Sequence, residues 1–346
     1  MDFTKDLLNW YSKNKRDLPW RNTVDPYKIW LSEIILQQTR IEQGLPYYQA
    51  FTKNFPTITD LALASEDDVL KLWQGLGYYS RARNLHYTAK YIYNDLNGSF
   101  PNTFTEIQKL KGIGPYTAAA IASFAFKEPK AVVDGNVFRV LARVFGIYDD
   151  IATSKTRNIF QELADQLISR KNPDLFNHAI MDFGATVCQP ANPKCDSCIF
   201  NDHCFAYLQN EVSSLPVKIK KINVKNRYLN FLILSHDNKI VIEQRDSKDI
   251  WQKLYQLPVL ETNDSNEENL FNTLEKMYPD NTIKKITPHT IKHKLSHQLL
   301  HINFYEVSVN GFKNQQKTAS IENLHLYAYP IVIWNFLKDF FWLEKN

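Results

Sequence analysis

Hydrophobic side chains recur at steps of three and four residues along the first two thirds of the chain, which is the spacing of an α-helix with one buried face. Such runs, separated by Gly and Pro, continue to about Phe205. They predict an all-α region over residues 1–208. One of them predicts a helix that ends at Pro46 and contains Leu31, Ile34, Ile35, Gln38, Ile41 and Leu45.

The pattern changes at residues 209–226, a polar and basic stretch with no sustained periodicity. We predict an exposed connector there. Beyond it, the runs RYLNFLILS and IVIEQR, joined by DNK, predict a β-hairpin. Residues 227–346 are therefore expected to form an α+β domain. Its later predicted elements are a helix near Glu267–Met277, strands near Ile283–His289 and Leu299–Val309, and a helix near Tyr329–Leu343.

Composition narrows the class of protein. With 346 residues, 44% of them hydrophobic, the chain is long enough for two or three domains with their own cores and needs no disulfides. Its net charge of +4 permits a polyanionic partner without demanding one. The N-terminal segment is charged throughout, and no apolar stretch is long enough to cross a bilayer. We expect a monomeric, cytoplasmic and nucleoid-associated protein with no membrane partner.

All four cysteines lie in one short segment, at Cys188, Cys195, Cys198 and Cys204. Four thiolates at this spacing can converge on one centre, and they suit either zinc or a [4Fe–4S] cluster. Zinc ribbons present two CxxC pairs, whereas this loop has one CxxC flanked by wider gaps, as in the cluster loop of the endonuclease III superfamily, which it resembles. The spacing favours a [4Fe–4S] cluster, whose simplest role is to cross-link the end of the helical region.

A second motif, LKGIGPYT, lies between two helical patterns. Together the three segments span residues 105–126, approximately. Gly112 and Gly114, followed by Pro115, allow a tight turn whose backbone N–H groups point outward at the start of the second helix. Such a turn can bind phosphate without a basic side chain. An ordinary corner between two helices explains the local pattern equally well. Together with the cysteine loop, the motif resembles the helix-hairpin-helix of the same superfamily.

Two carboxylates stand out by their surroundings. Glu33 lies among apolar residues, which should raise its pKa and make it a candidate general acid, although a solvent-facing helix glutamate is the simpler alternative. Asp134 precedes an amphipathic helix and could be a plain N-cap. Cleavage of an N-glycosidic bond needs one acid for the departing base and one lasting negative charge near the sugar. Glu33 and Asp134 fit that division.

These motifs occur in a recognisable order: Glu33, then LKGIGPYT, then VDGN, then the cysteine loop. In this respect residues 1 to about 205 resemble adenine DNA glycosylases of the MutY type, and the C-terminal part resembles, more weakly, their Nudix-like domain. The resemblance implies a helix-hairpin-helix glycosylase fold, a six-helix barrel with an iron–sulfur cluster domain, joined to an α+β Nudix-like domain over 227–346.

The resemblance also implies catalytic roles. Glu33 would protonate adenine, while Asp134, with Asn136 beside it, would stabilise the cationic sugar with support from Tyr116. Bifunctional members of the superfamily carry a lysine where this sequence has Tyr116, and that lysine forms a Schiff base with the sugar. Its absence predicts a monofunctional glycosylase, although nearby Lys111 leaves weak lyase activity open.

Other residues are implied to contact DNA. Trp20 and Arg21 match residues of the adenine pocket, whereas Leu36, Gln38 and Tyr78 match residues that wedge into the duplex beside the flipped base. Simpler alternatives exist, since Trp20 and Leu36 could be core residues and Arg21 a surface charge.

Two positions depart from the family pattern. His178 replaces a Glu or Gln that faces the adenine edge, and we expect its contact to be pH-sensitive. In KHKLSHQLLH, Leu295 replaces the aromatic residue of a loop that probes oxidised guanine, while Ser296 and His297 keep its polar part. A core-strand histidine is the alternative for His297. The domain lacks the R-E-x-x-E-E metal signature of Nudix hydrolases and is expected to recognise the lesion without hydrolysing nucleotides.

The function expected from these observations is excision of adenine paired with 8-oxoguanine or guanine in double-stranded DNA, by base flipping. Two alternatives remain open at this point. One is an endonuclease III-like pyrimidine glycosylase-lyase, and the other is a non-catalytic iron–sulfur DNA-binding protein. Pyrophosphatase activity of the C-terminal domain is a third idea, and we expect none.

Overall fold

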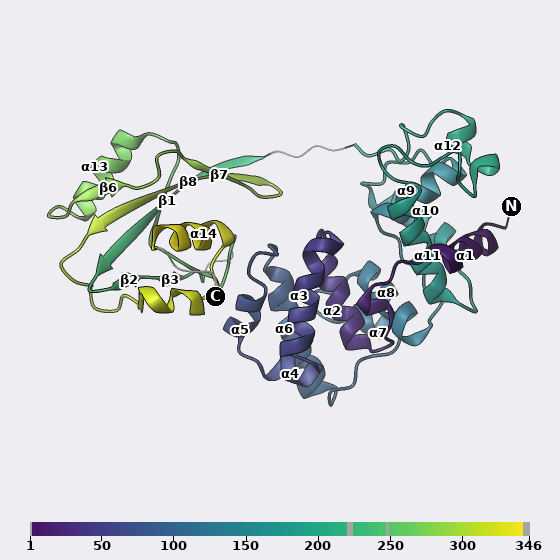
Figure 1. Ribbon diagram of the computed structural model, residues 1–346, viewed down its shortest axis with the longest axis horizontal. Helices are drawn as coiled ribbons and strands as arrows, with labels where there is room; N and C mark the ends of the chain where they lie inside the picture. Colours follow the sequence, from purple (N-terminus) through teal and green to yellow (C-terminus); the bar gives the residue numbers. More distant parts are fainter. Residues whose placement is uncertain (1, 220–223, 247–248, 342–346) are drawn as a thin grey trace. The chain divides into compact units, whose positions relative to one another are not determined.

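The computed structural model describes residues 2–219, 224–246 and 249–341. The chain divides into two compact units, which are drawn in Figure 1. The helical unit comprises Met1–Leu63 and Asn84–Lys220, and the sheet unit comprises Ala64–Arg83 and Lys221–Asn346. The sequence pattern did not predict that Ala64–Arg83 would group with the C-terminal part of the chain.

The helical unit is built around amphipathic helices whose apolar faces meet. Helix α9 carries Val137, Val140, Leu141 and Val144 into a core shared with α1 and α11, while α2 packs on α8. The helices are α1 (Phe3–Asn14), η1 (Pro19–Arg21), α2 (Pro26–Leu36), α3 (Ile41–Asn54), α4 (Ile58–Leu63), α6 (Ser80–Asp95, with its first turn in the sheet unit), α7 (Phe104–Gln108), α8 (Pro115–Phe126), α9 (Gly135–Phe145), α10 (Ser154–Leu167), α11 (Pro173–Thr186), η2 (Asn201–His203) and α12 (Phe205–Leu208).

The single helix predicted to end at Pro46 is wrong. Helix α2 ends at Leu36, and α3 begins at Ile41 and contains Pro46 in its interior. The chain leaves the helical conformation between them because Gln38 adopts a left-handed backbone with φ of 57°. The apolar spacing continues across the break since both helices bury residues in the same unit, so periodicity alone could not reveal the interruption.

The sheet unit is a mixed sheet with a helix on each face. Within the described residues, seven strands form the order β6-β8-β1-β2-β9, with β5 also pairing β1 and β7 also pairing β8. Strands β1 and β8 run parallel, and the remaining pairs of this sheet are antiparallel. The elements are α5 (Glu66–Leu72), β1 (Lys225–His236), β2 (Lys239–Val241), β3 (Glu243–Gln244), β4 (Tyr255–Gln256), β5 (Val259–Thr262), α13 (Glu267–Met277), β6 (Ile283–Lys285), β7 (Ile291–Lys294), β8 (Gln298–Ser308), β9 (Thr318–Ser320), η3 (Ile321–Leu326) and α14 (Ile331–Phe340).

The two faces of β1 bury alternate side chains, as the pleat of a strand requires. Phe231 and Ile233 pack toward Leu337 of α14, whereas Leu232 and Leu234 pack toward Leu274 of α13. Figure 1 shows these two helices on opposite sides of the pair β1 and β8. Both faces of the central strands are therefore buried, which explains their nearly continuous apolar sequence.

Most of the predicted C-terminal elements are confirmed. The turn of the hairpin has Asp237 and Asn238 at φ of 46° and 57°, the left-handed conformations that a two-residue hairpin turn needs. Helix α13 spans the predicted residues, and β8 and α14 lie within one or two residues of their predicted starts. The strand predicted at Ile283–His289 is wrong beyond Lys285, and Leu343, the predicted end of α14, lies outside the described residues.

The prediction of an exposed connector is wrong for its first half. Leu215 is fully buried, and its carbonyl accepts a hydrogen bond from Arg143. The backbone N–H of Ile151 also donates to the carbonyl of Val217. The segment up to Val217 therefore packs against the helical unit, since its apolar side chains complete that core.

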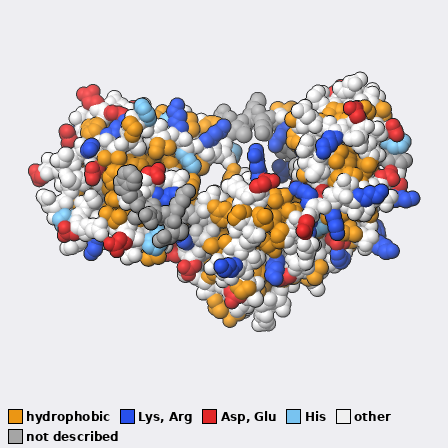
Figure 2. Space-filling model, in the orientation of Figure 1, with side chains coloured by type: hydrophobic (Ala, Val, Ile, Leu, Met, Phe, Trp, Pro, Cys, Tyr) orange, Lys and Arg blue, Asp and Glu red, His pale blue; other side chains and the backbone are white. Residues whose placement is uncertain are grey.

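Charge is spread over the surface of both units. On the face shown in Figure 2, Lys and Arg side chains lie among Asp, Glu and apolar side chains, in agreement with the small net charge of +4. Among the described residues, every helix falls short of the length and apolar character that a bilayer crossing requires.

Candidate active site and cysteine centre

Glu33 is a buried carboxylate at the centre of the candidate active site. Glu33 lies in helix α2, where residues 29–35 are all buried, and Glu33 itself is only 9% exposed. Burial raises the pKa of Glu33 to about 7, and the charge of Asp134 adds to this effect. A hydrogen bond with Tyr116 and the charge of Arg21 act in the opposite direction. The alternative of a solvent-facing glutamate is therefore wrong.

Tyr116 lies in the first turn of α8 and hydrogen-bonds the Glu33 side chain. Its own pKa is raised well above the ordinary value, mainly by burial and then by the charges of Glu33 and Asp134. The hydroxyl therefore keeps its proton and serves as a neutral partner. The ammonium of Lys111 lies 4.0 Å from the ring centroid of Tyr87 on α6, where cation–π attraction holds it.

Asp134 is both an N-cap and a buried charge. One carboxylate oxygen accepts hydrogen bonds of 2.8 Å from the backbone N–H groups of Asn136 and Val137, and the other accepts one of 3.0 Å from Asn136 Nδ2. Burial raises the pKa of Asp134, whereas these hydrogen bonds and the charge of Arg139 oppose the rise. The capping role and a role for the charge are therefore compatible.

Arg139 connects this cap to the cysteine loop and was not predicted from the sequence. Its guanidinium donates to Asn136 Oδ1 at 2.8 Å, to the Gly184 carbonyl at 2.7 Å and to the Cys188 carbonyl at 2.7 Å. Helix α11 comes this close because residue 184 is glycine, where a Cβ would lie 2.7 Å from the Cβ of Asn136. The only available signal was an arginine between the buried positions Val137 and Val140.

The two residues predicted in the adenine pocket are adjacent in the chain. Trp20 is buried, and the side chain of Arg21 is 8% exposed. Trp20 packs edge-on against Tyr48 with ring centroids 5.3 Å apart. Arg21 forms a fork-shaped pair with Asp182, with N–O distances of 2.6 and 2.7 Å, so it is not a surface charge. Arg16 donates to the same carboxylate. Asp182, fully buried and missed in the sequence, fixes the orientation of Arg21.

His178 lies on α11 and stacks on Phe124 of α8, with ring centroids 4.0 Å apart and planes 9° from parallel. Burial lowers the pKa of His178 to about 3, and the charge of Arg21 contributes to the same shift. The imidazole is therefore neutral throughout the physiological range. This pKa does not favour the pH-sensitive contact predicted at this position.

The glycine hairpin has the predicted form, a turn between α7 and α8. Gly112 has φ of 80°, and a Cβ there would lie 2.6 Å from the Cβ of Asn84 on α6, so glycine is required. Gly114 is the N-cap of α8 without a side-chain cap, and space in front of it is open. The first N–H groups of α8 are thus free of a competing side-chain acceptor at the cap.

The residues predicted to wedge into DNA divide between the two units. In the helical unit, Leu36 is the last residue of α2 and is half-buried, and Gln38 lies two residues further on and is exposed. Tyr78 belongs to the sheet unit, is 47% exposed and has φ of 48°. Its hydroxyl lies 2.5 Å from Ser296 Oγ. The structure thus joins Tyr78 to one residue of the predicted lesion-probing loop.

That loop, Leu295–His297, is the tip between strands β7 and β8. It lines a pocket of about 500 Å³ together with residues 75–80 and 249–251. Ser296 and His297 are exposed, so the alternative of a core-strand histidine is wrong. Leu295 is half-buried and packs against the core under β1, which leaves only part of its side chain available to a ligand.

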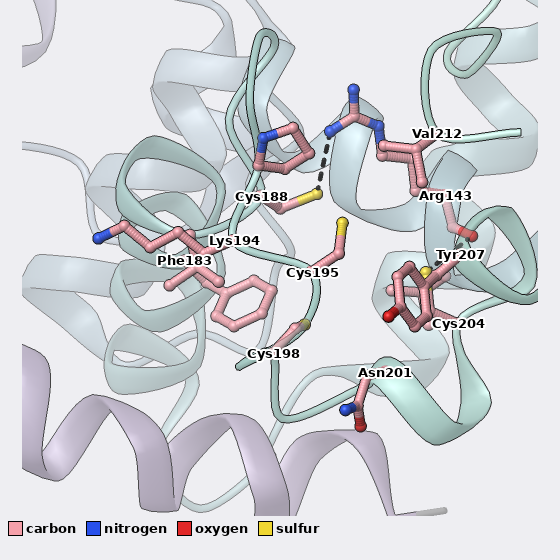
Figure 3. A pocket seen from close by; sticks show the side chains of 13 residues that line it. Arg143, Phe183, Cys188, Lys194, Cys195, Cys198, Asn201, Cys204, Tyr207 and Val212 are labelled. Carbon is pink, nitrogen blue, oxygen red and sulfur yellow. Dashed lines mark hydrogen bonds between the residues drawn. The ribbon is translucent and has the colours of Figure 1, made fainter. Parts of the chain in front are cut away.

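The four cysteine side chains line one pocket between α9, α11 and the loop that follows (Figure 3). Burial raises the pKa of the thiols of Cys195, Cys198 and Cys204, so a metal centre must displace their protons. No group of three or more Cys, His, Asp or Glu side chains in the described part of the chain is arranged around a single metal ion. Four sulfur donors around a common space fit the ligand set of a [4Fe–4S] cluster.

Family models match both units. A model described as "HhH-GPD superfamily base excision DNA repair protein" matches residues 31–166, and a model described as "NUDIX domain" matches residues 230–339. A protein of Buchnera aphidicola subsp. Baizongia pistaciae named "Adenine DNA glycosylase" is 39% identical over 324 residues, which cover 91% of this chain and 90% of that protein.

Solved structures resemble the helical part. A thermostable thymine-DNA glycosylase is 31% identical with a TM-score of 0.56, and the alignment covers 60% of this chain and 95% of that one. A trapped covalent complex of endonuclease III with DNA has a TM-score of 0.52 at 20% identity, with 60% of this chain and 94% of that one covered. The second likeness concerns the fold alone.

Proposed function

Because this chain belongs to the adenine DNA glycosylase family, we propose that it removes adenine from double-stranded DNA by hydrolysing the N-glycosidic bond. The family and fold predicted from the sequence are confirmed, including the helix-hairpin-helix glycosylase region and the Nudix domain. The observation that carries the proposed activity is the buried Glu33, whose pKa is raised to about 7 beside Tyr116 and Asp134.

The proposed reaction follows from these three groups. Protonated Glu33 donates its proton to the flipped adenine, and the electrons of the N-glycosidic bond leave with the base. The sugar becomes cationic, and the Asp134 carboxylate stabilises it. Water then adds to the sugar carbon and gives its proton to the Glu33 carboxylate, which restores the acid. No lysine stands where Tyr116 does, so the reaction ends at the abasic site without a Schiff base.

We assign recognition of the partner base to the sheet unit. Ser296 and His297 are exposed at a hairpin tip, and Tyr78 hydrogen-bonds Ser296, which gives a polar tip with an aromatic side chain beside it. Such a surface can read the edge of 8-oxoguanine or guanine opposite adenine. The glycine hairpin would hold a DNA phosphate with the N–H groups of α8. The substrate would be chromosomal DNA in the nucleoid, bound by a monomer.

We further propose that Cys188, Cys195, Cys198 and Cys204 hold a [4Fe–4S] cluster. When bound, such a cluster would cross-link the loop after α11 and supply a centre capable of one-electron chemistry. The alternative ligand, zinc, is distinguished by measuring iron, sulfide and zinc in the purified protein.

A panel of duplexes tests the function. Adenine is placed opposite 8-oxoguanine, guanine, cytosine or thymine, and a further duplex carries an oxidised pyrimidine. We expect alkali-labile sites at adenine opposite 8-oxoguanine and guanine only. A thymine-DNA glycosylase shares this fold, so release of the pyrimidine with an adduct trapped by borohydride would favour the glycosylase-lyase alternative. Tight binding without any base release would favour a non-catalytic DNA-binding protein.

The pH dependence of adenine release provides a second prediction. Glu33 acts in its protonated form, and its pKa is about 7, so the active fraction falls as pH rises through 7. The single-turnover rate constant should be nearly level below about pH 6 and decrease about tenfold per pH unit well above pH 7. The enzyme concentration is kept saturating at every pH, so that changes in DNA affinity do not affect the measured rate constant. A rate constant that increases through neutral pH would contradict Glu33 as the acid.

A further inference from the structure

Arg143 is a buried arginine at the edge of the cysteine pocket. It lies one helical turn after Arg139 on α9 and is 3% exposed. Its guanidinium donates to the carbonyls of Leu215 at 3.0 Å, Gln189 at 2.7 Å and Pro190 at 3.3 Å. The same group lies 3.5 Å from the sulfur of Cys188, the contact drawn as a dashed line in Figure 3.

The charge of Arg143 has no carboxylate partner among the ion pairs of the described residues. Among the other arginines with buried side chains, Arg21 pairs with Asp182 and Arg227 pairs with Asp249. Arg139 on the same helix has only carbonyl and amide acceptors within the described residues, but its hydrogen bonds do not include a cysteine sulfur. A guanidinium stays charged at any physiological pH, and a buried charge is costly unless an opposite charge compensates it. Carbonyl oxygens satisfy its hydrogen bonds but carry no net charge.

We propose that Arg143 is the counter-charge of the cysteine centre, offsetting the negative charge that four thiolates and their cluster bring into this pocket. The inference rests on the proposed [4Fe–4S] cluster and goes beyond it, because it assigns a role to a residue that is not a ligand. A positive charge at this distance favours the more reduced, more negative state of the cluster. Arg143 therefore raises the reduction potential and slows loss of iron.

The competing explanation is purely structural. Arg143 ties Gln189, Pro190 and Leu215 together, and loss of these hydrogen bonds could loosen the loop without any effect of charge. Two substitutions separate the explanations. Arg143→Lys keeps the charge but loses the fork of donors, whereas Arg143→Gln keeps polar atoms and loses the charge.

The experiment uses the full-length protein purified without oxygen. Iron and sulfide content, the reduction potential by voltammetry and the rate of iron release to a chelator are measured for each variant. Arg143→Gln should lower the potential and speed iron release by about 10-fold or more, the range found when groups around a metal site are removed. Arg143→Lys should keep the wild-type potential. Lys194→Gln, which removes an exposed charge from the same pocket, should change neither quantity.

Several outcomes overturn the proposal. If Arg143→Gln keeps the wild-type reduction potential and rate of iron release, the charge of Arg143 has no role. If both Arg143 variants change these two quantities equally, Arg143 has only a structural role. If Arg143→Gln does not fold, Arg143→Lys still decides, because a lowered potential in a variant that keeps the charge contradicts the inference. Zinc without iron in the wild-type protein would instead refute the proposed cofactor, and the Arg143 inference with it.

Discussion

Replacing Glu33 by Gln is expected to slow adenine release by about 10²–10⁴-fold, the usual contribution of a general acid. Gln has nearly the same shape and can keep the hydrogen bond with Tyr116, but it cannot give up a proton to the base. Tyr116, which hydrogen-bonds Glu33, cannot replace it as the acid, because burial raises the pKa of Tyr116 well above the ordinary value. Single-turnover assays on adenine opposite 8-oxoguanine measure the effect.

The same substitution should not weaken the fold. The pKa of Glu33 is higher in the folded protein than the ordinary 4.5, so ionisation above that pH disfavours the folded state. Gln cannot ionise, and the unfolding midpoint of Glu33→Gln at pH 8 should equal or exceed that of wild type. DNA affinity should also be kept. Glu42→Gln, at an exposed position of α3, is the matched control. Normal turnover in Glu33→Gln would rule out the assignment.

The sequence predicted what depends on local pattern. Glu33 was found because α2 surrounds it with apolar residues, and Asp134 because it precedes an amphipathic helix. The hairpin at Asp237 and Asn238 was found for the same reason, since two residues that accept left-handed conformations lie between two strands. Breaks such as the one at Gln38 were missed because apolar spacing continued across them.

Residues whose role depends on distant partners were not predicted. Asp182 pairs with Arg21, which is 161 positions away in the chain, and nothing near either residue indicates the pair. Arg139 and Arg143 contact a loop more than 40 positions further on, at distances in sequence of 49 and 45 for Cys188. In the sequence, these two arginines are distinguished only as charged residues within a helix whose other residues are mostly apolar. Only the tertiary structure shows that they contact Cys188.

Helix α9 brings these observations together. Its N-cap is Asp134, its second turn carries Arg139 and its third carries Arg143. Arg139 donates hydrogen bonds to Asn136, which contacts Asp134, and to the carbonyl of Cys188. Arg143 contacts the sulfur of Cys188. The candidate active site and the cysteine centre are therefore attached to one rigid element. Three hydrogen bonds, from Arg139 to the Cys188 carbonyl, from Arg139 to Asn136 and from Asn136 to Asp134, connect the cysteine loop to the Asp134 cap.

The charge of Asp134 can be separated from its capping role by replacing it with Asn. Asn is as good an N-cap as Asp, so the backbone N–H groups of residues 136 and 137 keep an acceptor. The new amide group would face the Asn136 amide, and the loss of that hydrogen bond should cost about 1 kcal/mol of stability. Without the carboxylate, however, the cationic sugar loses its nearest proposed counter-charge. We expect adenine release to slow by about 10²–10³-fold.

Asp25→Asn is the matched control for that prediction, because Asp25 caps α2 with the same kind of hydrogen bond, to the N–H of Tyr27 at 2.9 Å. Asp25→Asn should keep nearly the wild-type stability in thermal unfolding, and Asp134→Asn should lose about 1 kcal/mol. Only Asp134→Asn should lose activity. If both variants keep the wild-type rate of adenine release, Asp134 is a cap and nothing more. If both lose activity in proportion to stability, the effect arises from helix unfolding. Only the selective loss establishes that the negative charge at the start of α9 acts on the reacting sugar.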